Sequence, residues 1–402
     1  MERDISQKLI EWKNSKKHKP LLITGVRQCG KTYAIKQFGN KEFKNMVYLN
    51  FEENPNLNSV FEYDFNVKRI LDEISLMCQS GIIAGETLLV FDEIQECPKA
   101  ITSLKYFCEN MPDLHVVCAG SLLGVAIKKK SIAFPVGKIS RMKMYPMSFR
   151  EFVKADGGER FIQALENWPL DRPLTEYYSV PMTSYLHAYY AVGGMPEAVY
   201  EWINSHDISQ VETIQDEILD DYSDDFSKHA PLKEIEKIRW IWDSVPVQLA
   251  KENNKFVFSH VKQGKRANEL EDALQWLQDA GLITKLELIE KIEYPLAYAA
   301  DKTSFKVYMS DIGLLRRKSG LSYSVISGSN ELFARYKGAL AENFVLNELI
   351  TLGQSPFFWR SGNTAELDFI IEKDDSVIPI EVKSADHTQA KSLKLFCQRY
   401  TP

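Results

Sequence analysis

The sequence lacks the paired cysteines, long apolar runs and excess positive charge that mark several classes of protein. Its six cysteines are scattered and form no Cys-x-x-Cys pair, which argues against a disulfide framework or a zinc site. No run of about 18 apolar residues occurs, and the N-terminal MERDISQKLIEWKNSKKHKP has no apolar signal core. The net charge of −6 and the pI near 5.8 argue against a non-specific nucleic-acid coat. We therefore expect a cytoplasmic protein without a membrane partner.

The 402 residues are enough for two to three domains of ordinary size, at roughly 150 residues each. Hydrophobic residues make up 45% of the chain and charged residues 26%, as in a globular protein with several buried cores. The chain shows neither an internal repeat nor a low-complexity linker. Domain boundaries must therefore be found from changes in the secondary-structure pattern.

Strand-like and helix-like segments alternate over the first 150 residues. Short aliphatic or β-branched runs occupy residues 21–24, 46–51, 87–91, 114–119 and, more weakly, 142–145. Segments long enough for crossover helices lie between them, at 67–79 and 99–110. This alternation predicts an α/β domain with a parallel sheet covered by helices on both faces.

A phosphate-binding loop is predicted immediately after the first of these strands. The segment matches G-x-x-x-x-G-K-[ST], follows the strand LLIT and opens the helix KTYAIKQF. Its two glycines allow a tight turn that points backbone amides at a phosphate, and the helix N-terminus adds partial positive charge. We expect the lysine to contact the β- and γ-phosphates of ATP and the threonine hydroxyl to bind Mg²⁺. The expected nucleotide-binding residues are Gly25, Val26, Arg27, Gln28, Cys29, Gly30, Lys31, Thr32 and Tyr33.

A second motif, TLLVFDE, ends an apolar strand with two acids about sixty residues further on. Asp92 is expected at the carboxyl end of its strand, where it binds the Mg²⁺ together with Thr32. Glu93 is expected to polarise the attacking water, which distinguishes a hydrolase from a nucleotide switch. The two motifs together predict an ATP-hydrolysing enzyme whose catalytic residues include Lys31 and Glu93.

The chain resembles a large group of bacterial and archaeal AAA+ ATPases with an uncharacterised C-terminal domain. The resemblance covers nearly the whole length. It rests on the segments ITGVRQCGKT, LLVFDEIQECP, AGSLLG, PVGK…YPMSFREF, GGMPEAV, ELEDALQWLQDAGLI, VYMSDIGLL and ELDFIIE…IPIEVKSA. It implies an AAA+ P-loop ATPase domain, then a helical and winged-helix middle, then a C-terminal domain. The biological role of the group is largely undefined, so the resemblance predicts an architecture rather than a pathway.

The resemblance also implies roles for residues after the fourth strand. Ser121 stands where AAA+ proteins carry a sensor for the γ-phosphate or the lytic water, although a cap of the helix SLLGVAI is an equal alternative. Members of the group often have an arginine finger at the position of Lys138, and here Arg141 is close by. Relatives usually continue beyond the position of Pro402, which leaves open a shortened C-terminal domain.

The middle of the chain predicts helices and then a helix-turn-helix with a wing. A helical stripe ends at Ala280-Gly281, and its members are Leu270, Ala273, Leu274, Leu277 and Ile283. The strand-like TKLELIEKIEY and SFKVYMS follow. The expected recognition helix is acidic, with Glu269, Glu271, Asp272 and Asp279, which would repel DNA phosphates. The basic residues just before it, Lys262, Lys265 and Arg266, could still touch DNA. We favour protein–protein contact for this segment.

Near the C-terminus, Asp368, Glu381 and Lys383 form a D…E-x-K arrangement, with Glu342 on the preceding predicted helix. This resembles the core of restriction-endonuclease-like folds, in which two carboxylates bind a divalent metal and a lysine activates water. Alternation along the strands predicts that Glu381 and Lys383 lie on the same face of one strand, and that Glu366 and Asp368 likewise lie together on one face of theirs. We expect Asp368 and Glu381 to meet across neighbouring strands, with Lys383 beside them. The alternative is a charged hairpin face with an ordinary Glu–Lys salt bridge.

Four segments are therefore expected: an AAA+ domain at 1–150, a helical lid at 151–231, a winged-helix-like domain at 232–320 and a restriction-endonuclease-like domain at 321–402. Our main hypothesis is an ATPase whose nucleotide state positions a nuclease-like domain on nucleic acid. The alternative is an ATP-dependent switch that docks partner proteins and cleaves nothing. ATP and Mg²⁺ are the expected cofactors, and DNA, partner proteins and a second copy of the chain are the candidate partners.

Overall fold

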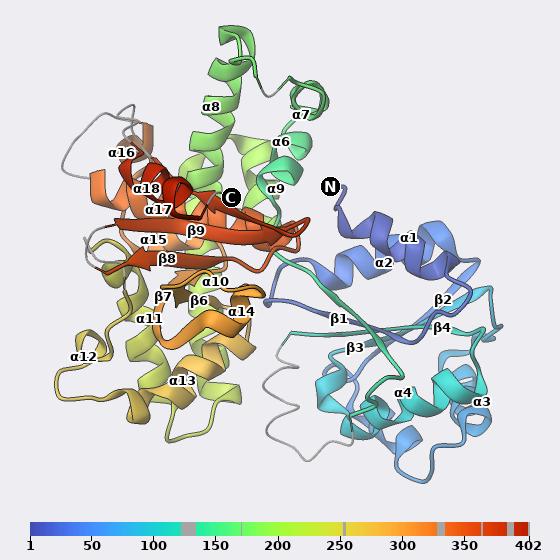
Figure 1. Cartoon of the computed structure of the whole chain (residues 1–402). Coiled ribbons are helices and arrows are strands. Elements are labelled where there is room, and N and C mark those ends of the chain that lie inside the picture. The colour runs from blue at the N-terminus through green and yellow to red at the C-terminus, as the bar shows by residue number, and fades with distance from the viewer. Residues whose placement is uncertain are drawn as a thin grey trace. The chain divides into compact units, whose positions relative to one another are not determined.

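The computed structural model describes residues 1–121, 134–169, 171–251, 255–327, 334–362, 365–383 and 390–400. The chain divides into two units, Met1–Tyr145 and Pro146–Pro402, which we call the N-terminal and the C-terminal unit. Figure 1 shows the helices and strands of each unit.

The N-terminal unit is built on a five-stranded sheet in which every strand pairing is parallel. The strand order is β2-β3-β4-β1-β5. The strands are β1 (Leu21–Thr24), β2 (Asn45–Asn50), β3 (Thr87–Asp92), β4 (His115–Gly120) and β5 (Ser140–Lys143). The predicted α/β fold is confirmed, and each strand lies within two residues of its expected start and end. All carboxyl ends therefore meet at one edge of the sheet, where α/β proteins bind ligands.

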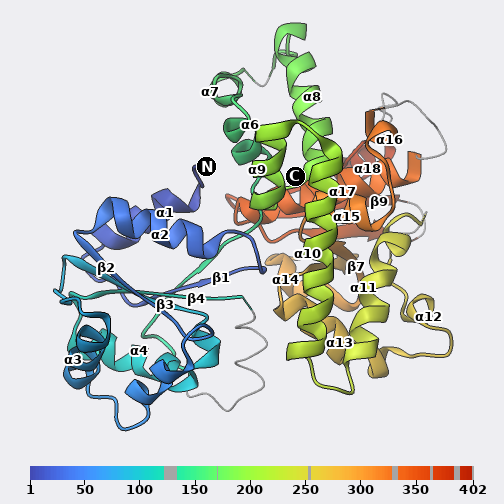
Figure 2. The ribbon, with the colours of Figure 1, turned by 180° about the vertical axis from the view of Figure 1, so that it is seen from behind.

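Helices cover both faces of this sheet, α1 and α2 on one face and α3 and α4 on the other, as Figures 1 and 2 show. Their bounds are α1 (Ile5–Asn14), α2 (Lys31–Glu42), α3 (Val67–Cys78) and α4 (Pro98–Asn110). Two short 3₁₀ segments, η1 (Pro55–Phe61) and η2 (Ile94–Glu96), lie between them along the chain. The cover explains why every residue of β3 and β4 is buried, as expected for parallel strands between two helical layers.

The C-terminal unit begins with helices. They are α6 (Phe149–Ala155), α7 (Glu159–Glu166), α8 (Glu176–Val192), α9 (Pro196–Ser205), α10 (Ile208–His229), α11 (Ile235–Leu249), α12 (Phe258–Val261) and α13 (Ala267–Asp279). Four members of the expected helical stripe are buried on α13, namely Leu270, Ala273, Leu274 and Leu277. The fifth, Ile283, is not helical, because α13 ends before Gly281 and Ile283 begins the strand β6. Among the described residues of both units, no helix is both long and apolar enough to cross a bilayer.

A mixed five-stranded sheet forms the rest of this unit, in the order β10-β9-β8-β6-β7. The strands are β6 (Ile283–Ile289), β7 (Ala300–Met309), β8 (Phe357–Ser361), β9 (Ala365–Lys373) and β10 (Ser376–Ile380), and only β6–β8 is a parallel pair. The helices around it are α14 (Leu296–Ala299), α15 (Ile312–Lys318), α16 (Tyr323–Ser327), α17 (Ala334–Thr351) and α18 (Lys391–Tyr400). The hairpin expected as a wing, β6–β7, thus continues into the C-terminal strands through β8.

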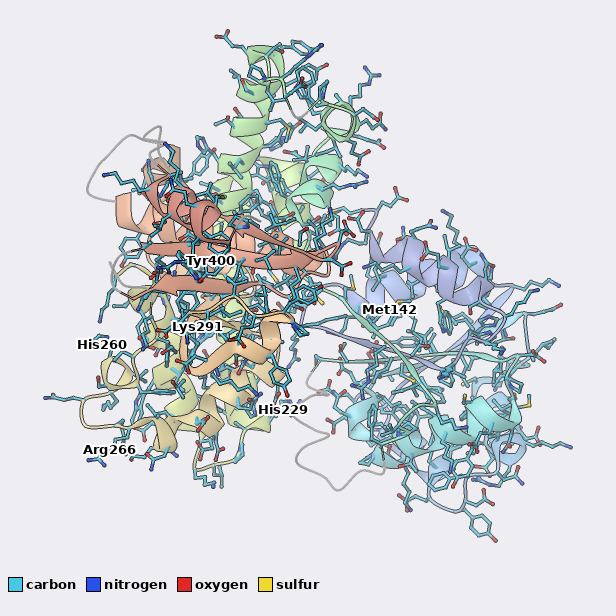
Figure 3. The ribbon with its side chains drawn as sticks, in the orientation of Figure 1. Met142, His229, His260, Arg266, Lys291 and Tyr400 are labelled. Atoms are coloured by element: carbon cyan, nitrogen blue, oxygen red, sulfur yellow. The ribbon has the colours of Figure 1, made fainter. Side chains whose placement is uncertain are left out.

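Helix α18 packs on this sheet through aromatic side chains. Phe396 is fully buried, with its ring centroid 5.1 Å from that of Trp359 on β8. Tyr400, near the end of the same helix, lies 6.1 Å from Trp359 and is labelled in Figure 3. These contacts cover one face of the mixed sheet with the last helix of the chain.

The motifs GGMPEAV and VYMSDIGLL meet at a buried carboxylate. Asp311 accepts hydrogen bonds from Gly194 N at 2.7 Å and from Leu314 N at 2.9 Å. A Cβ at Gly193 would lie 2.3 Å from Asp311 Oδ1, so only glycine fits there. Burial raises the pKa of Asp311 to about 6, although the backbone donors oppose the rise. This contact fixes the start of α15 beside the end of α8.

Candidate functional site

The predicted phosphate-binding loop connects β1 to α2, with two residues in left-handed conformations. Gln28 has a φ of 64° and Gly30, which caps α2, a φ of 92°. Gly25 is required for a different reason, because a Cβ there would lie 2.1 Å from the carbonyl oxygen of Met144. The loop therefore leads directly into the first turn of α2, whose amides have no acceptor within the helix.

Lys31 begins α2, and its ammonium group lies inside the loop. The side chain is 7% exposed, and Nζ donates to the carbonyl oxygens of Gly25 at 2.9 Å and Val26 at 2.8 Å. Neutral carbonyls satisfy its hydrogen bonds without cancelling its charge. The lysine therefore places positive charge beside the loop amides, an arrangement suited to a polyphosphate.

The N-terminal segment holds this loop in place through Arg3, which the sequence did not single out. Its guanidinium donates to Cys29 O at 3.0 Å and to Tyr145 O at 2.7 Å. Arg3 is 7% exposed and Cys29 is fully buried. The loop is thus anchored to the segment that follows β5.

The two predicted magnesium ligands are in direct contact. Thr32 Oγ1 donates a 2.7 Å hydrogen bond to Asp92 Oδ2, across sixty residues of sequence. The hydroxyl of Tyr48, on β2, donates to the same oxygen at 2.6 Å. Burial, reinforced by this bond to Asp92, raises the pKa of Tyr48 above its ordinary value, so the phenol keeps its proton. No sequence motif marked Tyr48, because one tyrosine in an alternating strand is common.

The predicted base and the predicted sensor are also neighbours. Glu93 follows β3 with a φ of 48°, an uncommon value for a residue with a side chain. Its Oε2 accepts hydrogen bonds from Gln95 Nε2 at 2.6 Å and from Ser121 Oγ at 3.3 Å. Ser121 directly follows β4, which lies between β3 and β1 in the sheet. The helix that it would cap in the alternative interpretation falls outside the described residues.

The other residues proposed around the nucleotide have different surroundings. Tyr33 is 57% exposed on the first turn of α2. Lys138 forms a 2.9 Å ion pair with Glu109. Arg141 stacks over the ring of Phe134, 4.6 Å from its centroid. Lys138 and Arg141 thus both have partners within their own unit.

In the C-terminal unit, two of the predicted carboxylates interact and the third pairs with the predicted lysine. Burial, reinforced by the nearby negative charge of Glu342, raises the pKa of Asp368 to about 6. Glu381 Oε1 lies 2.5 Å from Lys383 Nζ, which is the salt bridge of the hairpin alternative. Asp368 Oδ2 also accepts a hydrogen bond from Val382 N at 2.7 Å.

Glu381 and Lys383 were expected to lie on a strand, but β10 ends at Ile380. The reason is local. The amide of Val382 donates to the carboxylate of Asp368 rather than to a backbone carbonyl, so the ladder of β10 and β9 stops before Glu381. Glu381 and Lys383 therefore follow the strand instead of lying on it.

A divalent metal does not fit this arrangement well. Within the described parts of the chain, no group of three or more His, Cys, Asp or Glu side chains could hold a metal ion. Glu342 accepts a hydrogen bond from Tyr308 at 2.8 Å and faces the ammonium of Lys306 at 3.6 Å. Lys306 belongs to no sequence motif, and its one signal is a lone lysine in the apolar strand SFKVYM.

Two of the three basic residues considered for DNA contact have partners within the C-terminal unit. Lys265 forms a 2.6 Å ion pair with Glu269 on α13, and Lys262 lies over the ring of Trp240. Figure 3 shows Arg266, the residue before α13, at the periphery of the C-terminal unit. Partnered lysines beside an acidic helix offer little free positive charge to a phosphate backbone.

Comparison with known proteins identifies the N-terminal unit. A family model described as an AAA domain matches residues 17–153. Two further models, each described only as a domain of unknown function, match residues 183–324 and 337–401. The AAA match includes the loop, Asp92, Glu93 and Ser121. The N-terminal unit therefore has the fold of an AAA-type P-loop domain.

Two proteins are similar to this chain over most of its length. An uncharacterised protein of Methanocaldococcus jannaschii is 25% identical over 92% of this chain and 74% of its own length. An uncharacterised protein of Haemophilus influenzae is 25% identical over 94% of this chain and 84% of its own length. Among solved structures, a Walker-type ATPase of Pyrococcus abyssi aligns over 79% of this chain and 95% of its own, with 16% identity and a TM-score of 0.49.

Proposed function

We propose that this chain binds Mg²⁺-ATP at the carboxyl edge of its parallel sheet and hydrolyses it to ADP and phosphate. The observation that carries the proposal is the direct contact of Thr32 Oγ1 with Asp92 Oδ2 at 2.7 Å, beside Glu93. A hydroxyl and a carboxylate are the hard oxygen donors that Mg²⁺ prefers. Thr32 and Asp92 would hold the ion, which would supply positive charge against the phosphates.

The loop residues bind and orient the phosphates. Lys31 already points its ammonium group into the loop, where it donates to two carbonyl oxygens. Phosphate oxygens are stronger acceptors for an ammonium than neutral carbonyls. The anchored backbone of the loop and the N-terminus of α2 then hold the nucleotide without first having to become ordered.

Glu93 is the proposed general base. Its Oε2 is fixed by Gln95 and Ser121, and we assign the proton taken from the attacking water to Oε1. Ser121 positions this carboxylate and stands where the water and the γ-phosphate would be sensed. Tyr48 has a supporting role, since its hydroxyl holds Asp92 in one orientation.

For the C-terminal unit we propose nucleotide-controlled binding of a partner protein rather than cleavage of nucleic acid. Two observations favour this alternative over a nuclease. The lysine of the D…E-x-K arrangement is paired with Glu381 at 2.5 Å, whereas a nuclease would need it beside a phosphodiester. The lysines before the acidic helix α13 are likewise engaged.

One experiment tests both proposals. Phosphate release from ATP is measured with Mg²⁺, with EDTA, and with added single- or double-stranded DNA. We expect turnover that needs Mg²⁺ and does not change with DNA. The Lys31→Ala chain is the control for contaminating ATPases, because the loop loses its ammonium and should no longer bind ATP.

The outcomes separate the two parts of the proposal. Wild-type turnover no greater than that of Lys31→Ala would refute the ATPase assignment. Turnover that rises severalfold with DNA would instead refute the protein-docking proposal and restore the nucleic-acid hypothesis. Metal-dependent nicking of the added DNA, abolished by Lys383→Ala, would also refute it.

A further inference from the structure

A buried lysine lies among the acidic residues of the C-terminal unit. Lys306, on β7, is 1% exposed. Its Nζ lies 2.8 Å from Glu366 Oε1 and 3.6 Å from Glu342 Oε2. Glu342 comes from α17 and Glu366 from β9, so one ammonium group joins three elements of the unit.

The other carboxylate oxygens of this cluster are largely bound by protein donors. Glu366 Oε2 accepts from Arg360 Nη2 at 2.6 Å. Asp368 accepts from Val382 N, and Glu381 pairs with Lys383. Glu381 Oε2 is buried with no hydrogen-bond partner among the described residues. One such oxygen is far from the six ligands that Mg²⁺ requires.

The charges of the cluster nearly balance. Its four carboxyl groups are Glu342, Glu366, Asp368 and Glu381, and its three cations are Lys306, Arg360 and Lys383. Four negative and three positive charges leave one negative charge when all are ionised. Burial alone would lower the pKa of Lys306, but the negative charges of Glu342 and Glu366 outweigh it and hold this pKa above its ordinary value. The ammonium group is therefore charged at neutral pH.

We propose that Lys306 is the resident cation of this acidic cluster and takes the place that a divalent metal would have there. A buried ammonium at hydrogen-bond distance from the ligand oxygens repels a second cation, and little water is available to screen it. Moving the ammonium group away from the carboxylates would leave a buried charge without a counter-charge, which is strongly unfavourable. The C-terminal unit of this chain therefore does not load a metal between Glu342 and Asp368.

The lysine and the acids of this cluster come from two different segments of the chain. Lys306 belongs to the segment that matches one domain of unknown function, residues 183–324, and the four acids belong to the segment that matches the other, residues 337–401. Each segment supplies charges that the other neutralises. The cluster thus ties β7 to α17 and β9 as an ion network, with a structural role in place of a catalytic one.

Binding of Mn²⁺ to the full chain without nucleotide tests the proposal, by electron paramagnetic resonance or calorimetry. We expect no wild-type Mn²⁺ site that responds to Asp368→Asn. The Lys306→Met variant should bind Mn²⁺ at least about tenfold more tightly than the wild type, and adding Asp368→Asn should remove that gain. Lys285→Met is the matched control, because Lys285 also forms an ion pair with an acid, Glu287, which lies two residues further along the same strand.

Loss of the lysine leaves unpaired acids and could unfold the chain. The Lys306→Met/Glu366→Gln variant removes one acid together with the lysine and provides the same comparison. Wild-type Mn²⁺ binding that Asp368→Asn abolishes would overturn the proposal. Folded variants that lack the lysine and still bind no Mn²⁺ would overturn it as well, since the lysine would then not stand in for a metal.

Discussion

Replacing Glu93 with glutamine removes a proton acceptor and leaves the rest of the site nearly unchanged. Glutamine has the same length and shape, and its amide oxygen can still accept from Gln95 and Ser121, as Glu93 Oε2 does in the wild type. The backbone at this position has a φ of 48° in either case. Thr32 and Asp92 keep their 2.7 Å contact, so Mg²⁺ and ATP should still bind.

The expected loss follows from the role of a general base. Proton transfer by a positioned side chain contributes about 10²–10⁴-fold to a rate, or roughly 3–5 kcal/mol of activation free energy. Glu93 is oriented by two donors, so its contribution should lie within this range rather than below it. We expect Glu93→Gln to lower kcat by at least about 100-fold, with ATP affinity within about threefold of wild type.

Two measurements on the same preparation separate chemistry from binding. Single-turnover phosphate release gives the rate of the chemical step, and calorimetry gives the dissociation constant for ATP. Gln95→Ala is a useful companion, because it removes one donor to the carboxylate and keeps the base. Its rate should fall between those of the wild type and Glu93→Gln.

Two results would refute this reasoning. If Glu93→Gln hydrolyses ATP at the wild-type rate, Glu93 is a structural acid and the water is activated elsewhere. If the variant no longer binds ATP, the carboxylate acts in assembling the site, and the division of labour between Asp92 and Glu93 is wrong.

Two further predictions concern supporting groups. Tyr48→Phe removes the 2.6 Å hydrogen bond to Asp92. We expect the Mg²⁺ concentration for half-maximal turnover to rise about tenfold, as for other groups that orient metal ligands. An unchanged Mg²⁺ dependence would show that Tyr48 does not have this role. Asp311 has a pKa of about 6, above its ordinary 3.8, so the folded chain retains a proton that the unfolded chain releases. Stability from this group is therefore lost as pH rises from about 4 to about 6, and the wild type should lose up to roughly 3 kcal/mol relative to Asp311→Asn. Thermal unfolding of both chains across this range measures the difference, and parallel profiles would contradict it.

The sequence was sufficient to predict the parallel sheet and the residues at its carboxyl edge. Glycine, lysine and paired acids at fixed distances from apolar strands carry strong local signals. The order of the strands is not local, however, so the sequence could not show that β4 places Ser121 next to Glu93. The same limit concealed Tyr48, whose role depends on β2 lying beside β3.

In the C-terminal unit the motif residues were identified, but their partners were not. Asp368, Glu381 and Lys383 stand out because charged residues interrupt apolar strands. The cation beside Glu342 and Glu366 is Lys306. This lysine lies in a segment whose sequence pattern predicts a separate wing. Long-range electrostatic pairing depends on tertiary contacts and leaves almost no trace in local patterning.

The mixed sheet also limits how this protein can be cut or recombined. Strand β6 is hydrogen-bonded on one side to β7 and on the other to β8, which lies some seventy residues further along the chain. A truncation after residue 320 would uncover the β8-facing edge of β6 and leave Lys306 without Glu342 and Glu366. An uncovered strand edge invites pairing between chains. Gene fusions and deletions are therefore expected to keep the two uncharacterised segments together as one inherited module.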